Sequence, residues 1–267
     1  MNDSDPWIFL KAYTAARIAQ GRVGRSLPTS ALLSFQLDHA RARDAVHSTL
    51  DMITLLKQLS TVHPNFLVLQ SQVADRQTYL QRPDLGRKLS QASHMNLRKL
   101  SVPDGAGFNF CIVIADGLSA TAVNRHALPV VSGLIDAATD RNWSVAPVCV
   151  VEQGRVAIGD EIAHSLRAEL LVVLIGERPG LSSPDSLGAY LTYRPRPGLT
   201  DESRNCVSNI RPEGLPVEHA VQKINYRLTE MKHRRLSGVT LKDDMPMSTS
   251  ARISSPVAIG QSPGIQG

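Results

Sequence analysis

Polar, glycine-bearing turns follow three apolar segments that read as buried strands, and these turns are where the chain could do chemistry. Asp116 and Ser119 follow the first segment, Arg155 the second, and Glu177 the third. Carboxylates accept hydrogen bonds and guanidinium groups donate them, so the set can bind a polar ligand. A fourth polar segment, residues 204–209 with Cys206, precedes the last predicted helix. Open α/β sheets bind ligands at the carboxyl ends of their parallel strands, so we expect the four segments to converge there.

Each of these residues also has a purely structural interpretation. Asp116 and Gly117 can form a tight turn, and Ser119 can cap a helix. Glu177 and its arginine neighbour can be a solvated pair. Cys206 is more often a small packed residue than a reactive thiol. A functional site therefore depends on whether the fold brings the segments together.

The segment LLVVLIGERPG, residues 170–180, is the strongest indication of the fold. A short unbroken apolar run is typical of a strand buried on both faces. Further strands are predicted at 108–117, 144–154 and 187–195, with helices at 121–138, 160–167 and 216–235. This alternation favours an α/β fold with a mainly parallel sheet covered by helices.

The first hundred residues have a different character. Asp5 and Pro6 predict a helix start, with the helix running past Ile18 to a stop near Gly21 or Gly24. A second helix, capped by Thr29 or Ser30, is expected up to about residue 50. We therefore divide the chain into an N-terminal helical region (1–104), an α/β domain (105–240) and a disordered tail (241–267) rich in Ser, Pro and Gly.

Composition sets limits on the class of protein. The chain has 267 residues, 42% of them hydrophobic but only 4% aromatic, with a net charge of +5. No segment approaches the ~18 apolar residues of a membrane span, and the start does not resemble a secretory signal. Three scattered cysteines without a C-x-x-C pair argue against a disulfide scaffold or a zinc cluster, and no histidines have metal spacing. A cytoplasmic protein with reduced thiols is expected.

Several stretches, taken in order, resemble the ethanolamine ammonia-lyase small subunit family. They are LLSFQLDHARARDAV (32–46), YLQRPDLGRKL (79–89), IADGLSATAV (114–123), VEQGRVAIGDEI (151–162), VVLIGERPGL (172–181) and CVSNIRPEGLPVEHA (206–220). The resemblance covers about residues 14–238. It implies a doubly wound, Rossmann-like core with an N-terminal helical extension.

The resemblance also implies a function. The family's enzyme converts ethanolamine to acetaldehyde and ammonia with adenosylcobalamin by a radical mechanism. A barrel-shaped large subunit binds the substrate, and the cofactor lies between the two chains of a hetero-oligomer. The small subunit is expected to be inactive alone, without membrane or nucleic acid as a partner. The resemblance leaves open whether the enzyme lies free in the cytoplasm or inside a bacterial microcompartment.

Three cofactor-binding residues carry over where the family's motifs match: Val156, Glu177 and Cys206. A corrin is a broad apolar disc fringed with amides, so Val156 can pack on it and Glu177 can accept amide hydrogen bonds. Cys206 is expected to be a soft contact and no cobalt ligand. The resemblance implies neither catalytic residues nor metal ligands in this chain.

Two other classes remain open. A self-sufficient nucleotide-binding enzyme on a flavodoxin-like fold would place Asp116 and Ser119 at the phosphate, although the glycine fingerprint of dinucleotide sites is missing. A basic RNA-binding protein would use the early arginines, although aromatic residues are not interleaved with them.

Overall fold

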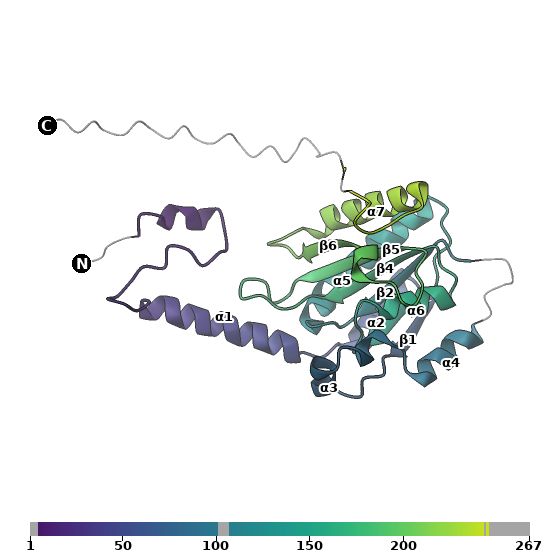
Figure 1. The fold of residues 1–267 in the computed structure, drawn as a ribbon, viewed down its shortest axis with the longest axis horizontal. Coiled ribbons are helices and arrows are strands. Elements are labelled where there is room, and N and C mark those ends of the chain that lie inside the picture. The colour runs from purple at the N-terminus through teal and green to yellow at the C-terminus, as the bar shows by residue number, and fades with distance from the viewer. Residues whose placement is uncertain (1–4, 101–106, 243, 246–267) are drawn as a thin grey trace.

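A six-stranded sheet forms the centre of the computed structural model, which describes residues 5–100, 107–242 and 244–245. The strand order is β1-β3-β2-β4-β5-β6 (Figure 1). The pairs β1–β3, β2–β3 and β2–β4 are parallel, whereas β5 is antiparallel to both β4 and β6. Five strands therefore point the same way, which confirms the mainly parallel α/β sheet.

The six strands are β1 (Phe66–Gln70), β2 (Phe110–Ala115), β3 (Val148–Glu152), β4 (Leu170–Gly176), β5 (Leu187–Tyr193) and β6 (Asn205–Ile210). Strands β2 to β5 lie where the apolar segments predict strands, whereas β1 and β6 were not predicted as strands. Every residue of β2 and β4 is buried. Side chains alternate between the faces of a strand, so a strand buried on both faces needs helices on both sides.

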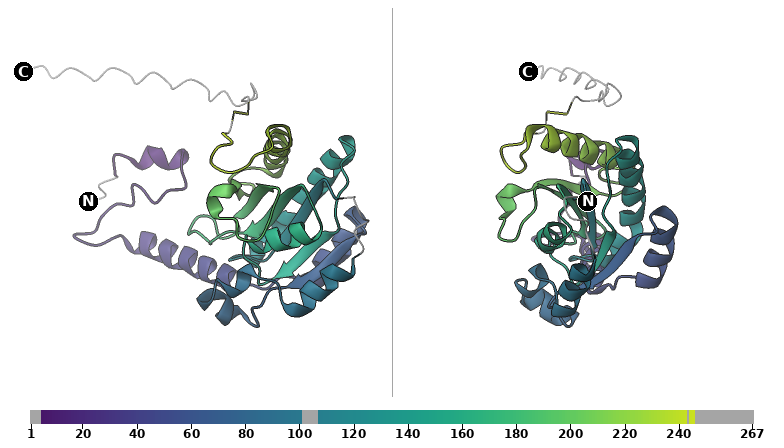
Figure 2. Two further views of the ribbon diagram at one scale, coloured as in Figure 1. Left: turned by 45° about the vertical axis from the view of Figure 1, so that its right-hand side comes forward. Right: turned by 90° about the vertical axis from the view of Figure 1, so that its right-hand side faces the viewer.

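Helices cover both faces of the sheet (Figure 2). On one face, Ile112 and Ile114 pack with α2 (Met52–Val62), α5 (Ala120–Asp140) and α7 (Val217–Arg234). On the other face, Cys111 and Val113 pack with α4 (Gln91–Lys99) and α6 (Ile158–Ser165). The chain leaves β2 through α5 on the first face and leaves β3 through α6 on the second. This is the doubly wound arrangement, which opens a crevice at the carboxyl ends of β2, β3 and β4.

The structure corrects one element at each end of the chain. The long first helix is wrong: only a short 3-10 helix, Ile8–Ala12, forms, and among the described residues none buries its apolar side chains, which a helix this short needs for stability. Residues 204–209, expected as a polar loop, are mostly strand β6, in which Asn205 and Val207 are buried while Cys206 and Ser208 are exposed. The strand was missed because polar residues at its exposed positions interrupt the apolar pattern.

The segment expected to be a helical region also contributes to the sheet. β1 pairs with β3 along its whole length. Two small elements, α3 (Arg76–Gln81) and the 3-10 helix Leu85–Arg87, then lead to α4. The domain boundary at 105 stays a prediction, and part of it and most of the predicted tail lie outside the described residues.

Residues 5–47 form an N-terminal arm that reaches away from the sheet (Figures 1 and 2). Its longest element is α1 (Thr29–His47), in which Ala45 is the one buried residue. Ten of the fourteen large hydrophobic side chains exposed in the described residues lie in the arm: Trp7, Ile8, Phe9, Tyr13, Val23, Leu27, Leu32, Leu33, Phe35 and Leu37. Among the helices described, none is long and apolar enough to cross a membrane.

Candidate functional site

The exits of β2 and β4 touch each other at the carboxyl edge of the sheet. The amide of Leu118 donates to the Gly176 carbonyl at 2.9 Å. Gly117 has a φ of +61°, which side-chain-bearing residues rarely adopt. A Cβ on Gly176 would lie 2.0 Å from the Ser119 carbonyl oxygen. Both glycines are therefore required for this close approach of two backbones.

Asp116 joins the exits of β2 and β3. Its Oδ1 accepts hydrogen bonds from the amides of Gly117 at 2.9 Å and Gly154 at 3.1 Å. Arg76 lies 3.7 Å from Oδ2 and also donates to the carbonyl oxygens of Val46 and Gly117. Burial raises the pKa of Asp116 to about 6, against the opposing effect of these donors. Asp116 is thus fully used in holding the edge together.

Ser119 also has a structural role, as the helix-cap interpretation predicts. Its Oγ accepts from the amide of Ala122 at 3.3 Å, which caps α5, and it donates to the Pro184 carbonyl at 2.8 Å. Neither Asp116 nor Ser119 is free to bind a phosphate. The nucleotide-binding alternative loses the two residues on which it depended.

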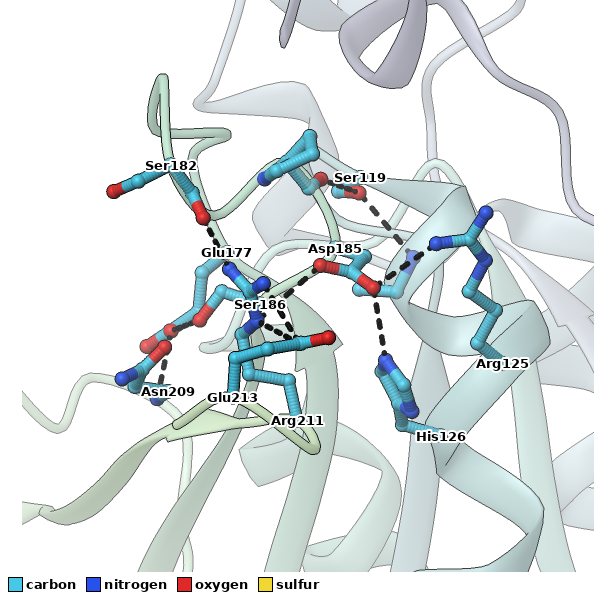
Figure 3. A network of polar contacts seen from close by, with 12 residues as sticks. Ser119, Arg125, His126, Glu177, Ser182, Asp185, Ser186, Asn209, Arg211 and Glu213 are labelled. Carbon is cyan, nitrogen blue, oxygen red and sulfur yellow. Dashed lines mark hydrogen bonds and ion pairs between the residues drawn. The ribbon is translucent and has the colours of Figure 1, made fainter. Parts of the chain in front are cut away.

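Glu177 is held in place by three donors from two other segments (Figure 3). Its carboxylate accepts from Ser186 Oγ at 2.5 Å, Ser208 Oγ at 2.7 Å and the amide of Asn209 at 3.1 Å. The last two donors come from β6, which runs parallel to β4 and so ends at the same edge. A carboxylate offers about four acceptor positions, so roughly one remains for a ligand.

A cavity of about 420 Å³ opens beside this carboxylate. Val156 and Glu177 both line it, so the structure brings these two predicted residues together. The remaining lining residues are Tyr79, Leu118, Arg155, Ile175, Gly176, Arg178 and Tyr190. One wall is therefore apolar, while the others carry a carboxylate and two guanidinium groups.

Cys206 does not line the cavity. It pairs with Tyr190 across the β5–β6 ladder, and Tyr190 stands between it and the cavity. Partial burial, with the Glu177 carboxylate nearby, raises the pKa of the Cys206 thiol. The thiol is consequently protonated at neutral pH, and any contact with a ligand depends on a molecule that extends over Tyr190.

A cluster of charged side chains around the buried Asp185, which we call the loop clamp, fixes the segment between Glu177 and β5 (Figure 3). Asp185 lies 3.0 Å from Arg125, 3.3 Å from His126 and 3.4 Å from Arg211. Arg211 also donates to the Ser182 carbonyl at 2.6 Å and pairs with Glu213. Sequence reasoning missed the clamp, because no local pattern connects residues that are 26 and 59 or 60 positions apart.

Arg155, noted in the sequence as a polar residue after the second strand, also lines the cavity, and so does Tyr79, which sequence reasoning did not single out. Tyr79 is fully buried, and its hydroxyl donates to the Gly154 carbonyl at 3.0 Å. Both residues lie in stretches that carry the family resemblance, which was the available signal. In the part of the chain that the structure describes, no group of three or more His, Cys, Asp or Glu side chains could hold a metal ion.

Comparison with known proteins identifies the family. Residues 4–242 match the family model described as ethanolamine ammonia-lyase light chain (EutC). A protein of Pseudomonas fluorescens (strain Pf0-1) named ethanolamine ammonia-lyase small subunit is 53% identical over 249 residues, covering 93% of this chain and 91% of its own length. Proteins with the same name from Azotobacter vinelandii and Xanthomonas campestris pv. campestris are each 53% identical over 240 residues, covering 90% of this chain and 89% and 88% of their own lengths. The chain belongs to the ethanolamine ammonia-lyase small subunit family.

Proposed function

We propose that this chain is the small subunit of an adenosylcobalamin-dependent ethanolamine ammonia-lyase and forms one part of the cobalamin site, at the interface with a barrel-shaped large subunit. The observation that carries the proposal is the cavity at the carboxyl edge of the sheet. There Val156 supplies apolar surface, and Glu177 supplies a fixed carboxylate with acceptor capacity left over.

The residues present fit part of a corrinoid. Leu118, Val156 and Ile175 give the cavity an apolar side suited to the corrin ring, and Glu177 can accept from a peripheral amide. Cys206 would be a soft contact at the periphery, beyond Tyr190. The cavity is much smaller than a whole cobalamin, so a second chain has to cover the remainder of the cofactor.

The residues of this chain bind and orient the cofactor, and none of them is assigned to the chemical step. When bound, adenosylcobalamin supplies the radical that abstracts hydrogen from ethanolamine, which leads to acetaldehyde and ammonia. Glu177 and Val156 set the position of the cofactor relative to the other subunit. The close-packed edge around Gly117 and Gly176 excludes water from beneath it. We assign the groups that bind and rearrange ethanolamine to the large subunit.

The exposed side chains of the N-terminal arm support the proposal that this chain binds a partner chain. A run of exposed leucines and aromatic rings on α1 and the segment before it is unfavourable in water and is typical of an interaction surface. The arm comes close to the loop that follows Glu177, since Leu181 shares cavities with Ser34 and Asp38 of α1. A chain that covered the arm would therefore also reach the cofactor edge.

Reconstitution tests the proposal. The chain, its large subunit, adenosylcobalamin and ethanolamine are mixed, and acetaldehyde and the cob(II)alamin absorbance are followed. We expect turnover with both chains present and negligible activity with either chain alone. Equal turnover by the large subunit without this chain would refute the shared site.

A further inference from the structure

Two guanidinium groups in the cavity have no carboxylate partner. Arg155 and Arg178 both line the cavity, and no acidic side chain in the described ranges 5–100, 107–242 and 244–245 forms an ion pair with either. The one acidic residue in the lining, Glu177, is engaged by Ser186, Ser208 and Asn209. These donors are neutral, so the Glu177 carboxylate keeps its charge, and the lining carries two guanidinium charges against one carboxylate charge.

Arg155 is held rigidly in this position. Its amide donates to the Gly86 carbonyl at 2.7 Å, and its Nη2 donates to the Tyr79 carbonyl at 3.1 Å. The guanidinium carbon lies 4.1 Å from the centre of the Tyr79 ring. A Cβ on Gly86 would come within 2.9 Å of the Arg155 Cγ, so the glycine leaves room for the side chain.

The Arg155 guanidinium is also incompletely satisfied. Its Nε is buried and has no hydrogen-bond partner among the described residues. Burial lowers the pKa of Arg155, and the charges of Arg76 and Arg87 act in the same direction, against the opposing effect of Tyr79 and Asp116. Placing a desolvated cation beside two others is unfavourable unless an anion joins them. A fixed arginine with unused donors is half of an anion site.

We infer that Arg155, assisted by Arg178, binds the phosphodiester of the cofactor's nucleotide tail. This inference rests on the proposed function, because it concerns the same cavity. The peripheral side chains of the corrin are neutral amides, which would leave the excess positive charge of the lining uncompensated. The phosphodiester is anionic and accepts from a guanidinium fork in the geometry that arginine prefers. The site thus selects for a corrinoid that carries its nucleotide.

The test compares adenosylcobalamin with adenosylcobinamide, which has the same corrin and adenosyl group but lacks the nucleotide tail. Dissociation constants are measured by equilibrium dialysis on the assembled complex of both subunits. Arg155→Met should weaken cobalamin binding roughly tenfold to a hundredfold while changing cobinamide binding less than about twofold. Arg178→Met, which leaves the Tyr79 stack intact, should act in the same direction with a smaller effect.

Two controls accompany these variants. Arg155→Lys keeps the charge without the fork and should recover part of the cobalamin affinity. Arg196→Met removes an exposed arginine that follows β5, which runs antiparallel to β4 and so ends at the opposite edge of the sheet, and should change neither constant. Thermal unfolding of each variant shows whether the fold is retained.

The outcomes separate this inference from the proposed function. If the wild-type complex bound both corrinoids and Arg155→Met weakened them equally, or weakened neither, the phosphodiester assignment would be wrong and the proposed function would stand. If adenosine monophosphate bound the cofactor-free complex as tightly as cobalamin does, and Arg155→Met abolished that binding, the site would be one for free phosphates and the assignment would fail. If the wild-type complex bound neither corrinoid, both proposals would fail.

Discussion

Two carboxylates stand at the same sheet edge with different environments and therefore different roles. Asp116 is buried between two backbones and holds them together. Glu177 lies one strand away at the mouth of a cavity and keeps an acceptor position free. Burial, which raises the pKa of Asp116 to about 6, marks it as a structural group despite its position at the site.

The Asp116 carboxyl should make stability depend on pH. Its pKa rises from 3.8 to about 6 on folding, so the folded state binds the proton more tightly and loses stability as pH rises through this window. The loss amounts to roughly 3 kcal/mol between pH 4 and pH 7. The asparagine in Asp116→Asn cannot ionise, so the unfolding free energy of this variant should depend less on pH over that range. Its unfolding free energy should also be lower, because Arg76 loses its partner. Urea unfolding at several pH values checks this, and parallel profiles for the two proteins would contradict it.

Glu177→Gln should separate ligand binding from folding. A glutamine can keep the three hydrogen bonds if its oxygen accepts from Ser186 and Asn209 and its amide donates to Ser208. Unfolding free energy should therefore change by less than about 1 kcal/mol, whereas cobalamin affinity of the assembled complex should fall about tenfold. Absorbance titration gives the affinity, with Ser208→Ala as the control for the network. Unchanged affinity would remove Glu177 from the site.

At the scale of elements, the apolar runs predicted β2, β3, β4 and their helices because both faces of each strand are buried. β6 could not be predicted the same way, since its exposed positions are polar and its pairing with β5 depends on a distant strand. The direction of β5 could not be predicted either, because the hydrophobic periodicity of a strand carries no information on its orientation in the sheet. The site depends on both the existence of β6 and the direction of β5, because β6 ends beside Glu177 only if β5 is antiparallel.

The meeting of β2 and β4 depends on Gly176. In Gly176→Ala the added methyl would lie 2.0 Å from the Ser119 carbonyl oxygen and 2.7 Å from that of Asp116, so the two exits must separate. We expect a loss of about 3 kcal/mol or more in unfolding free energy, measured by urea denaturation. Gly180→Ala is the matched control in the same loop, because its methyl meets the end of one flexible side chain, Ser183 Oγ. Equal effects of the two substitutions would contradict this account.

Because of the loop clamp, the order of the segment after Glu177 should depend on the charge of Asp185. Although burial alone would raise it, hydrogen bonds from Arg125 and His126 hold the pKa of Asp185 below its ordinary value. The stabilisation is therefore present above pH 4 and disappears as pH falls through the lowered pKa. Asp185→Asn should cost roughly 2 kcal/mol and speed amide exchange in residues 180–186. Glu213→Gln, which removes an exposed partner of the same Arg211, should do neither. Unchanged exchange in Asp185→Asn would show that the clamp does not fix the loop.

At the scale of the whole molecule, the described residues form a packed α/β domain with an arm whose large apolar side chains stay mostly exposed. Sequence patterning predicted α1 as an amphipathic helix but could not show that its apolar side chains remain exposed in the isolated chain. The arm passes near Leu181 and Ser182, just beyond the cofactor edge. Arm and cavity are thus parts of one surface that a larger subunit can cover.

Leu33 tests whether that surface is the subunit interface. Its side chain is 58% exposed, so Leu33→Glu should leave the melting temperature of the isolated chain unchanged. If the large subunit covers the arm, burying the new carboxylate is costly, and the assembly should weaken about tenfold or more in analytical ultracentrifugation. Gln36→Glu introduces the same charge on the same helix at a polar position and should have a smaller effect. Equal dissociation constants for the wild type and Leu33→Glu would show that the large subunit binds elsewhere, and the exposed leucines would then require another partner, such as a second copy of this chain.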